Sequence, residues 1–230
     1  MEQSRIELRG AFSYALSFAL NPRGPDHLMT ECLAEFGEAF TPQASGVIEK
    51  ITGDKKYGKP YLEEKRGAIV TWHGEIYGVS DSLGYCAFAT TAAYGIDEQM
   101  ATDTLNTATG TELTAGQLMQ AGRRIVTLER CYNLREGWSR RCDTLPWRVM
   151  NETAVDLDLK QPVSATMDKN RLGRMLDDYY KINGWDQSNG FPLPETLESL
   201  GLEYTEEELG KLRNSAMTAE LPASCRLPED

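Results

Sequence analysis

Residues 81–86 read Asp-Ser-Leu-Gly-Tyr-Cys, which places a carboxylate and a thiol five positions apart on either side of a glycine. Apolar stretches that favour helices flank this segment, so we expect it to form the turn that joins them. Gly84 allows close approach to a ligand, the Asp81 carboxylate can accept two N–H bonds from an amino-pyrimidinone edge, and the Cys86 thiolate can ligate iron. The structural alternative, an N-capping aspartate followed by a buried cysteine, is favoured by the local sequence alone.

Composition and charge restrict the class of protein. The 230 residues carry 24 Lys and Arg against 35 Asp and Glu, and the resulting charge of −11 opposes binding to nucleic acid or anionic lipid. No apolar run approaches the roughly 18 residues that a spanning helix needs, so the sequence predicts a cytoplasmic protein without a membrane span. The five cysteines are scattered without a CxxC pair, so neither a disulfide framework nor a self-contained zinc site is expected.

Periodicity and capping residues predict a mainly α fold. The expected helices cover residues 6–20, 28–40, 62–79, 87–94, 97–108, 115–132, 169–182, 194–200 and 206–219. Asp97, Thr114 and Asp168 are expected N-caps. The segment 41–60 is rich in Thr, Gly, Lys and Pro with weak periodicity, and we expect it to form a loop excursion on the surface. Only short stretches such as 164–166 could pair as strands.

Two further features could carry chemistry. His73 lies eight residues before Asp81, and a packing or surface role is favoured over that of a second proton carrier. The Arg135–Arg148 loop, rich in arginine and tryptophan, could form an anion patch or could bridge to carboxylates for structural reasons. The remaining thiols are expected to be buried or incidental: Cys32, Cys131 and Cys225.

Five motifs follow one another in a fixed order along the chain. They are NPRGPDHL from residue 21, DSLGYC from 81, LERCYNLREG from 128, DTLPWR from 143 and LDDYY from 176, the last followed by GWD at 184. This ordered set resembles the carboxy-terminal part of the tungsten-containing aldehyde:ferredoxin oxidoreductase family over roughly residues 6–212. The resemblance implies that residues 1–230 form a helical domain like the carboxy-terminal domain of that family.

The resemblance also implies roles for individual residues. Asp81 resembles a carboxylate that hydrogen-bonds a pterin ring, and Cys86 resembles a ligand of the [4Fe-4S] cluster beside that pterin. Leu83, Gly84 and Tyr85 lie between them and are assigned by the same resemblance to the cofactor-binding turn. His27, in the RGPDHL segment, resembles a histidine near the tungsten, and an imidazole can donate or accept a proton near neutral pH.

The sequence departs from the family pattern in two places. Tyr85 stands where the family usually has leucine, and Cys142 stands where an acidic residue commonly precedes Asp143. Neither departure removes a proposed ligand. The family's other three cluster cysteines, in a CxxCxxxC segment, and its amino-terminal pterin-binding domain are not in these 230 residues.

We therefore expect a separate subunit of a hetero-oligomer, inactive alone. Its partner chain would supply the amino-terminal domain and the other cysteines, and the two would share a tungsten bis-pterin, or its molybdenum counterpart, and one [4Fe-4S] cluster.

Three functions stay open. The first is the interconversion of aldehydes and carboxylic acids with ferredoxin or a similar electron carrier, and the second is the reduction of an aromatic acyl-coenzyme A of the benzoyl-CoA type. The third is a non-catalytic helical scaffold. A scaffold would have no reason to keep Asp81, Cys86 and His27 in register, so the first function is favoured.

Overall fold

The computed structural model describes residues 7–24, 26–29, 31–35, 41–153, 167–213, 220 and 225. Within these ranges the chain forms helices joined by turns, with one isolated β-bridge between Trp185 and Pro192. The α-helices are α1 (Phe12–Leu20), α2 (Pro42–Thr52), α3 (Arg66–Leu83), α4 (Glu98–Thr109), α5 (Ala115–Arg135), α6 (Trp147–Asn151), α7 (Lys169–Asn183), α8 (Pro194–Ser199) and α9 (Glu206–Arg213). Short 3-10 turns are η1 (His27–Met29), η2 (Leu33–Glu35), η4 (Lys55–Gly58), η5 (Ala87–Ala89), η6 (Arg140–Cys142) and η7 (Glu203–Thr205). The prediction of a mainly α fold is confirmed.

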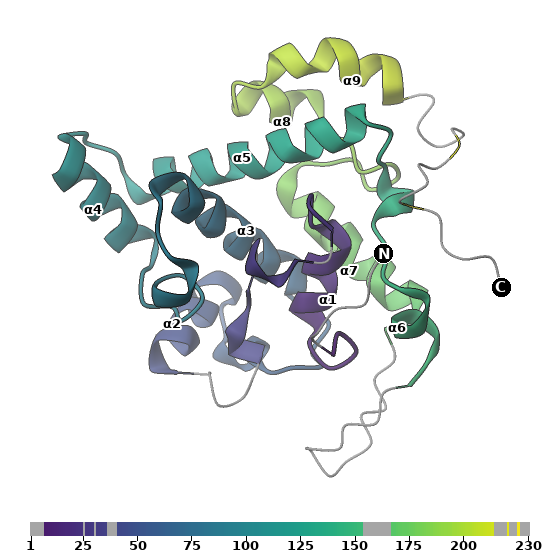
Figure 1. Cartoon of the computed structure of the whole chain (residues 1–230), viewed down its shortest axis with the longest axis horizontal. Helices are drawn as coiled ribbons and strands as arrows, with labels where there is room; N and C mark the ends of the chain where they lie inside the picture. The colour runs from purple at the N-terminus through teal and green to yellow at the C-terminus, as the bar shows by residue number, and fades with distance from the viewer. Residues whose placement is uncertain are drawn as a thin grey trace.

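Helices α3 and α5 cross at the centre of the molecule (Figure 1). Helices α1 and α7 pack against α3, α4 packs against α5 at one end, and α9 packs against α5 from above in this view. The largest apolar cluster joins α1, α3 and α7 and includes the fully buried side chains of Tyr14, Ile76 and Tyr180. No described helix is long and apolar enough to cross a membrane.

The predicted caps fix several helix boundaries. The Asp97 side chain accepts the Met100 N–H at the start of α4, and Asp168 accepts two N–H bonds at the start of α7. Thr114 and Gln117 form a reciprocal capping box on α5. Because each side chain satisfies N–H groups that the helix leaves unpaired, these three starts could be predicted from local sequence.

The expected helix over 28–40 is wrong within the described residues, which form η1 and η2 instead. The cause is a long-range contact. The buried Glu35 carboxylate accepts the Ser13 N–H of α1 at 2.9 Å and pairs with Arg66 of α3 at 2.9 Å. These two contacts, rather than a helical repeat, determine the path of residues 31–35. The first helix also begins later than expected, at Phe12.

The expected loop excursion at 41–60 is also wrong, because it contains α2 and η4. Thr41 caps α2, Pro42 occupies its first position, and Gly53 ends it in the left-handed conformation. Ala44 and Ile48 of this helix are fully buried.

One other expected helix also differs. The helix expected over 87–94 is reduced to η5. The possible strand at 164–166 and the end of the last expected helix, 214–219, lie outside the described residues.

The crossing of α3 and α5 depends on the absence of a side chain at Gly122. A Cβ at this position would lie 2.3 Å from the Glu75 carbonyl oxygen of α3. Backbone atoms in two packed helices cannot shift cheaply, so the two axes approach closely only with glycine here.

We expect Gly122→Ala to lower the free energy of unfolding by about 2 kcal/mol or more, because the added methyl group overpacks the crossing. Urea unfolding followed by circular dichroism measures the change. Gly116→Ala is the matched control on the same helix, since a Cβ there meets only the Thr114 Oγ1 at 4.0 Å. That control should be neutral or stabilising by up to about 1 kcal/mol, and equal losses in both variants would contradict this account of the crossing.

His73 lies within α3 and is fully buried. Its Nδ1 lies 2.7 Å from the Ile69 carbonyl oxygen and its Nε2 lies 3.0 Å from the Tyr94 hydroxyl. Burial lowers the pKa of His73 to about 4, so its imidazole is neutral at physiological pH. The structure thus shows the packing role for His73 rather than that of a second proton carrier.

This burial gives the protein a pH-dependent stability. The unfolded chain binds a proton at His73 below about pH 6.5 and the folded chain does so only near pH 4, so stability falls as the pH drops through that window. Between pH 6.5 and 4 the free energy of unfolding of the native protein falls as His73 titrates. We expect His73→Gln to reduce this fall by up to about 3 kcal/mol. Urea midpoints measured across this range test it, and parallel curves for both proteins would contradict it.

Candidate functional site

Residues 81–86 form the C-terminal end of α3 and the turn that follows. Gly84 adopts the left-handed conformation, with φ +75°, and its N–H donates to the carbonyl oxygens of Asp81 and Ser80. The Tyr85 N–H donates to the Ser80 oxygen at 2.9 Å, which closes the wider ring of a Schellman motif. A residue with a Cβ is strained in this conformation, so the glycine is required to end the helix and turn the chain towards Cys86.

Side chains in this turn alternate between the interior and the surface. Leu83 and Tyr85 pack on the apolar cluster formed by α3, α4 and α5, whereas Asp81, Gly84 and Cys86 are exposed. A Cβ at Gly84 would meet no atom within 4 Å, so the backbone there is open. Leu83 and Tyr85 are half-buried and anchor the turn on this cluster.

The exposure of Cys86 rejects the structural alternative of a buried cysteine, and the place of Asp81 in the last turn of α3 rejects the N-cap. The other four thiols are buried: Cys32, Cys131, Cys142 and Cys225. Phe88, two residues further on, is 63% exposed. Within the described part of the chain no three His, Cys, Asp or Glu side chains converge as a metal site. Cys86 is therefore the thiol of this chain that a ligand from outside could reach.

His27 opens η1 and is half-buried. Asp26 precedes it, and its side chain accepts the Leu28 N–H at 2.8 Å. Four residues after His27, Glu31 is 6% exposed, and its Oε2 has no hydrogen-bond partner among the described groups. Burial raises the pKa of Glu31, and the nearby His27 opposes that rise. The imidazole and a buried carboxyl are therefore electrostatic neighbours.

Helix α5 brings the histidine segment and the 81–86 turn to one side of the molecule. Burial raises the pKa of Glu129 on α5, Asp81 raises it further and Arg23 opposes the change, so both groups act on this carboxyl. The Asn133 side chain donates to the Pro22 carbonyl oxygen at 3.2 Å. Between the described residues no hydrogen bond or ion pair joins His27 directly to Asp81, and α5 is the helix that both segments share.

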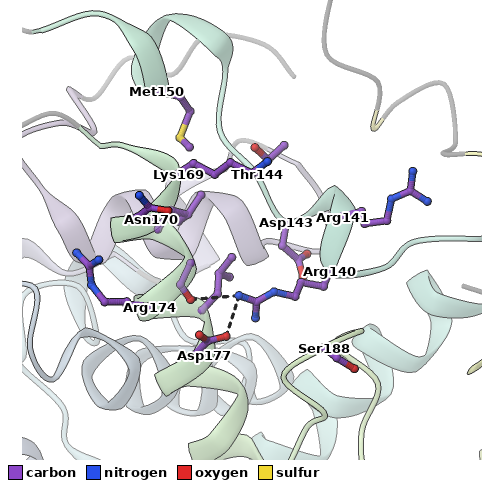
Figure 2. A pocket seen from close by; sticks show the side chains of 13 residues that line it. Arg140, Arg141, Asp143, Thr144, Met150, Lys169, Asn170, Arg174, Asp177 and Ser188 are labelled. Atoms are coloured by element: carbon purple, nitrogen blue, oxygen red, sulfur yellow. Dashed lines mark hydrogen bonds and ion pairs between the residues drawn. The ribbon is translucent and has the colours of Figure 1, made fainter. Parts of the chain in front are cut away.

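The Arg135–Arg148 loop lies in a different part of the molecule. It lines a pocket of about 790 Å³ with the first turns of α7 (Figure 2). Asp178 of α7 lies against Gly67 at the start of α3, whereas Cys86 follows the other end of that helix. The part of α7 that lines this pocket therefore neighbours the end of α3 opposite the 81–86 turn.

Carboxylates already balance most of the charge in and around this pocket. Arg140 pairs with Asp177 at 2.8 Å, and Arg174 pairs with Glu63. Beneath them, buried Asp143 receives a two-pronged contact from Arg130, at 2.8 Å for each oxygen. Within the loop itself, Arg140 follows the bridging alternative, as do Arg135, paired with Glu136, and Arg148, paired with Glu152. The anion role of the loop stays an untested prediction.

Two residues near the candidate site, Glu31 and Tyr94, belong to none of the sequence motifs. The four-residue spacing from His27 could have drawn attention to Glu31. Tyr94 is 4% exposed and has a positive φ of 55°, and no spacing rule marks it.

The chain is similar to known proteins over most of its length. The family described as aldehyde ferredoxin oxidoreductase, domains 2 and 3, matches residues 1–202. The tungsten-containing aldehyde ferredoxin oxidoreductase of Pyrococcus horikoshii is 30% identical over 196 residues, which cover 85% of this chain and 28% of that protein. The Pyrococcus furiosus enzyme of the same name is 29% identical over 203 residues, covering 88% of this chain and 30% of that protein. The chain therefore spans less than a third of the length of these relatives.

A solved structure shares the fold. It is the active-site complex BamBC of benzoyl coenzyme A reductase with 1,5-dienoyl-CoA, with a TM-score of 0.54 and 24% identity over 70% of this chain and 22% of that chain. The helical arrangement, the order of the motifs and the match over residues 1–202 lead to one conclusion: this chain belongs to the aldehyde ferredoxin oxidoreductase family.

Proposed function

We propose that this chain is one subunit of a cytoplasmic tungsten bis-pterin, iron–sulfur oxidoreductase that interconverts aldehydes and carboxylic acids and exchanges electrons with ferredoxin or a similar carrier. The observation that carries the proposal is the exposed turn at the end of α3, where Asp81 and Cys86 face solvent while the chain's other four thiols are buried. When bound, the metallopterin supplies the two-electron chemistry and the [4Fe-4S] cluster carries electrons one at a time.

The chain's own residues would hold and orient these groups. Cys86 supplies one thiolate to iron, and the Asp81 carboxylate accepts N–H bonds from the pterin. The left-handed Gly84 sets the path between them, while the packed side chains of Leu83 and Tyr85 keep the turn rigid. One short segment would therefore fix the pterin and the cluster relative to each other.

His27 would donate or accept the proton that accompanies the redox step. The carboxyl of Glu31 is a buried acidic neighbour of this imidazole, and burial raises the pKa of that carboxyl. This arrangement needs no further titratable group on α3, where His73 stays neutral.

A partner chain would supply the remaining parts. This chain offers one thiolate at the turn and spans 28–30% of the length of its relatives. We propose that the partner supplies a pterin-binding amino-terminal domain and the other three cluster cysteines. The exposed Phe88 beside Cys86 provides apolar surface that such a partner would cover.

The first test replaces the proposed iron ligand. We expect Cys86→Ala in the co-purified assembly to lose most of its iron and its cluster absorption, because an alanine cannot complete four-cysteine ligation. Iron analysis and electron paramagnetic resonance of the reduced assembly measure the loss. Cys131→Ala is the matched control, since its thiol is 4% exposed and touches Thr205 rather than the turn.

An unchanged cluster in the Cys86→Ala assembly would overturn this assignment. Preparations of the native assembly that contain neither tungsten nor iron in stoichiometric amounts would instead support the non-catalytic scaffold.

A second candidate is the reduction of an aromatic acyl-coenzyme A, favoured by the likeness of fold to BamBC. The two functions predict different electron flow. The first predicts that aldehydes reduce an artificial acceptor in the presence of the assembly, and the second predicts oxidation of a reduced viologen by an aromatic acyl-coenzyme A. Turnover of the aromatic thioester without any aldehyde oxidation would overturn the first candidate in favour of the second.

A further inference from the structure

The hydroxyl group of Tyr94 joins three segments of the chain that carry or support the proposed site. It lies 3.0 Å from the His73 Nε2 on α3, the helix that ends at the 81–86 turn. It also accepts the Ala34 N–H at 3.3 Å and lies 3.7 Å from the Cys32 sulfur. Both of these residues belong to the segment that follows His27, and Tyr94 itself ends the turn that begins at Cys86.

The directions of these hydrogen bonds are fixed by chemistry. A carbonyl oxygen only accepts, so the His73 Nδ1 carries the proton that it donates to Ile69. The neutral imidazole then has a lone pair on Nε2, and Tyr94 donates to it. Because burial raises the pKa of the Cys32 thiol to about 12, its S–H is a donor towards the Tyr94 oxygen. The phenol thus donates once and accepts twice, with no conflict among its partners.

The backbone at Tyr94 shows that these contacts hold it in place. A φ of 55° is uncommon for an aromatic residue and costs about 1 kcal/mol or more. The ring also stacks on Trp72, with 6.4 Å between ring centroids and 14° between planes, and meets His73 edge-on. A conformation of this kind persists only where the surroundings determine it.

Local hydrogen bonds stabilise the segment that runs from Cys86 to Tyr94. The Ala89 N–H donates to the Cys86 oxygen at 3.1 Å, and the Thr90 hydroxyl donates to the same oxygen at 2.8 Å. Such local bonds fix the shape of the turn and leave its position on the molecule undetermined. The Tyr94 side chain supplies a long-range attachment, 62 residues from Cys32 and 21 residues from His73.

We propose that Tyr94 is a positioning residue. Its hydroxyl group fixes residues 86–94, which begin at Cys86, against residues 31–35, which follow His27, and His73 is its anchor on α3. The inference rests on the proposed function for its consequence, because the separation of cluster ligand and proton carrier matters only if both act at one site. Its structural content stands alone: one buried phenol sets the relative position of the two segments.

The test uses the full chain and hydrogen–deuterium exchange. Tyr94→Phe keeps the ring and removes the hydroxyl, so we expect amides of both 86–92 and 31–35 to exchange about tenfold faster, as the loss of one buried hydrogen bond requires. Tyr180→Phe is the matched control. It removes another buried tyrosine hydroxyl, one that donates to Asp143, and it should leave exchange in both segments unchanged.

A second pair of variants keeps the test decisive if Tyr94→Phe does not fold. His73→Gln retains an acceptor for the phenol and should keep both segments protected, whereas His73→Leu removes it and should loosen them as Tyr94→Phe does. Exchange that rises in only one segment, or equally in Tyr180→Phe, would overturn the positioning role.

A spectroscopic measurement on the iron-loaded assembly separates this inference from the proposed function. Tyr94→Phe should alter the line shape or the reduction potential of the cluster, and Tyr180→Phe should not. If Cys86→Ala leaves the cluster intact while Tyr94→Phe loosens both segments, the proposed function fails and the positioning role stands. If Cys86→Ala loses the cluster while both segments stay protected in Tyr94→Phe, the reverse holds.

Discussion

The buried ion pair between Glu35 and Arg66 is the interaction on which the arrangement of the site depends. Both side chains are completely buried and lie 2.9 Å apart. Glu35 also binds the first amides of α1, and Arg66 donates to carbonyl oxygens of the segment before α3, among them Tyr57 at 2.9 Å. A charge left alone in this position would cost about 3–5 kcal/mol, so the pair forces α1, η2 and the start of α3 to meet at one point. The direction of α3, and hence the place of its far end, follows from that junction.

The two ends of α3 have opposite characters. Near its first turns the polar groups are buried and paired, as Glu35 and Arg66 are. A second buried pair, between Arg130 and Asp143, lies close to the neighbouring part of α7. At its last turn Asp81 and Cys86 are exposed, and Phe88 faces solvent beside them. The paired polar groups hold the first turns of α3 in place while its far end stays accessible, as the proposed binding of cofactors shared with a partner chain requires.

The sequence could predict the parts of this structure that local chemistry decides. Helix starts at Asp97, Thr114 and Asp168 follow from side chains that cap the amides next to them. The turn after α3 could be anticipated because a glycine follows a long apolar helix. The segment after His27 could not, since Glu35 is drawn to Arg66, which lies 31 positions further along the chain. Periodicity within a window carries no information about such a partner.

The same distinction applies to the candidate site. The residue types at positions 81, 84 and 86 indicate what the turn could bind, whereas the faces of α4 and α5 decide that Leu83 and Tyr85 point inward and Cys86 outward. No sequence pattern predicts a role for Tyr94, because that role depends on the three partners of its hydroxyl oxygen. Side-chain convergence of this kind becomes visible only in three dimensions.

The exposure of a single cysteine on a chain that encloses all its others has a consequence for biogenesis. Oxidants reach thiols according to their accessibility, so oxidative damage would concentrate at Cys86, the thiol that we propose as an iron ligand. Sulfinic or sulfonic acid formed there would abolish ligation permanently. Synthesis close in time and place to the companion polypeptide, or early delivery of the inorganic centre, would protect this atom.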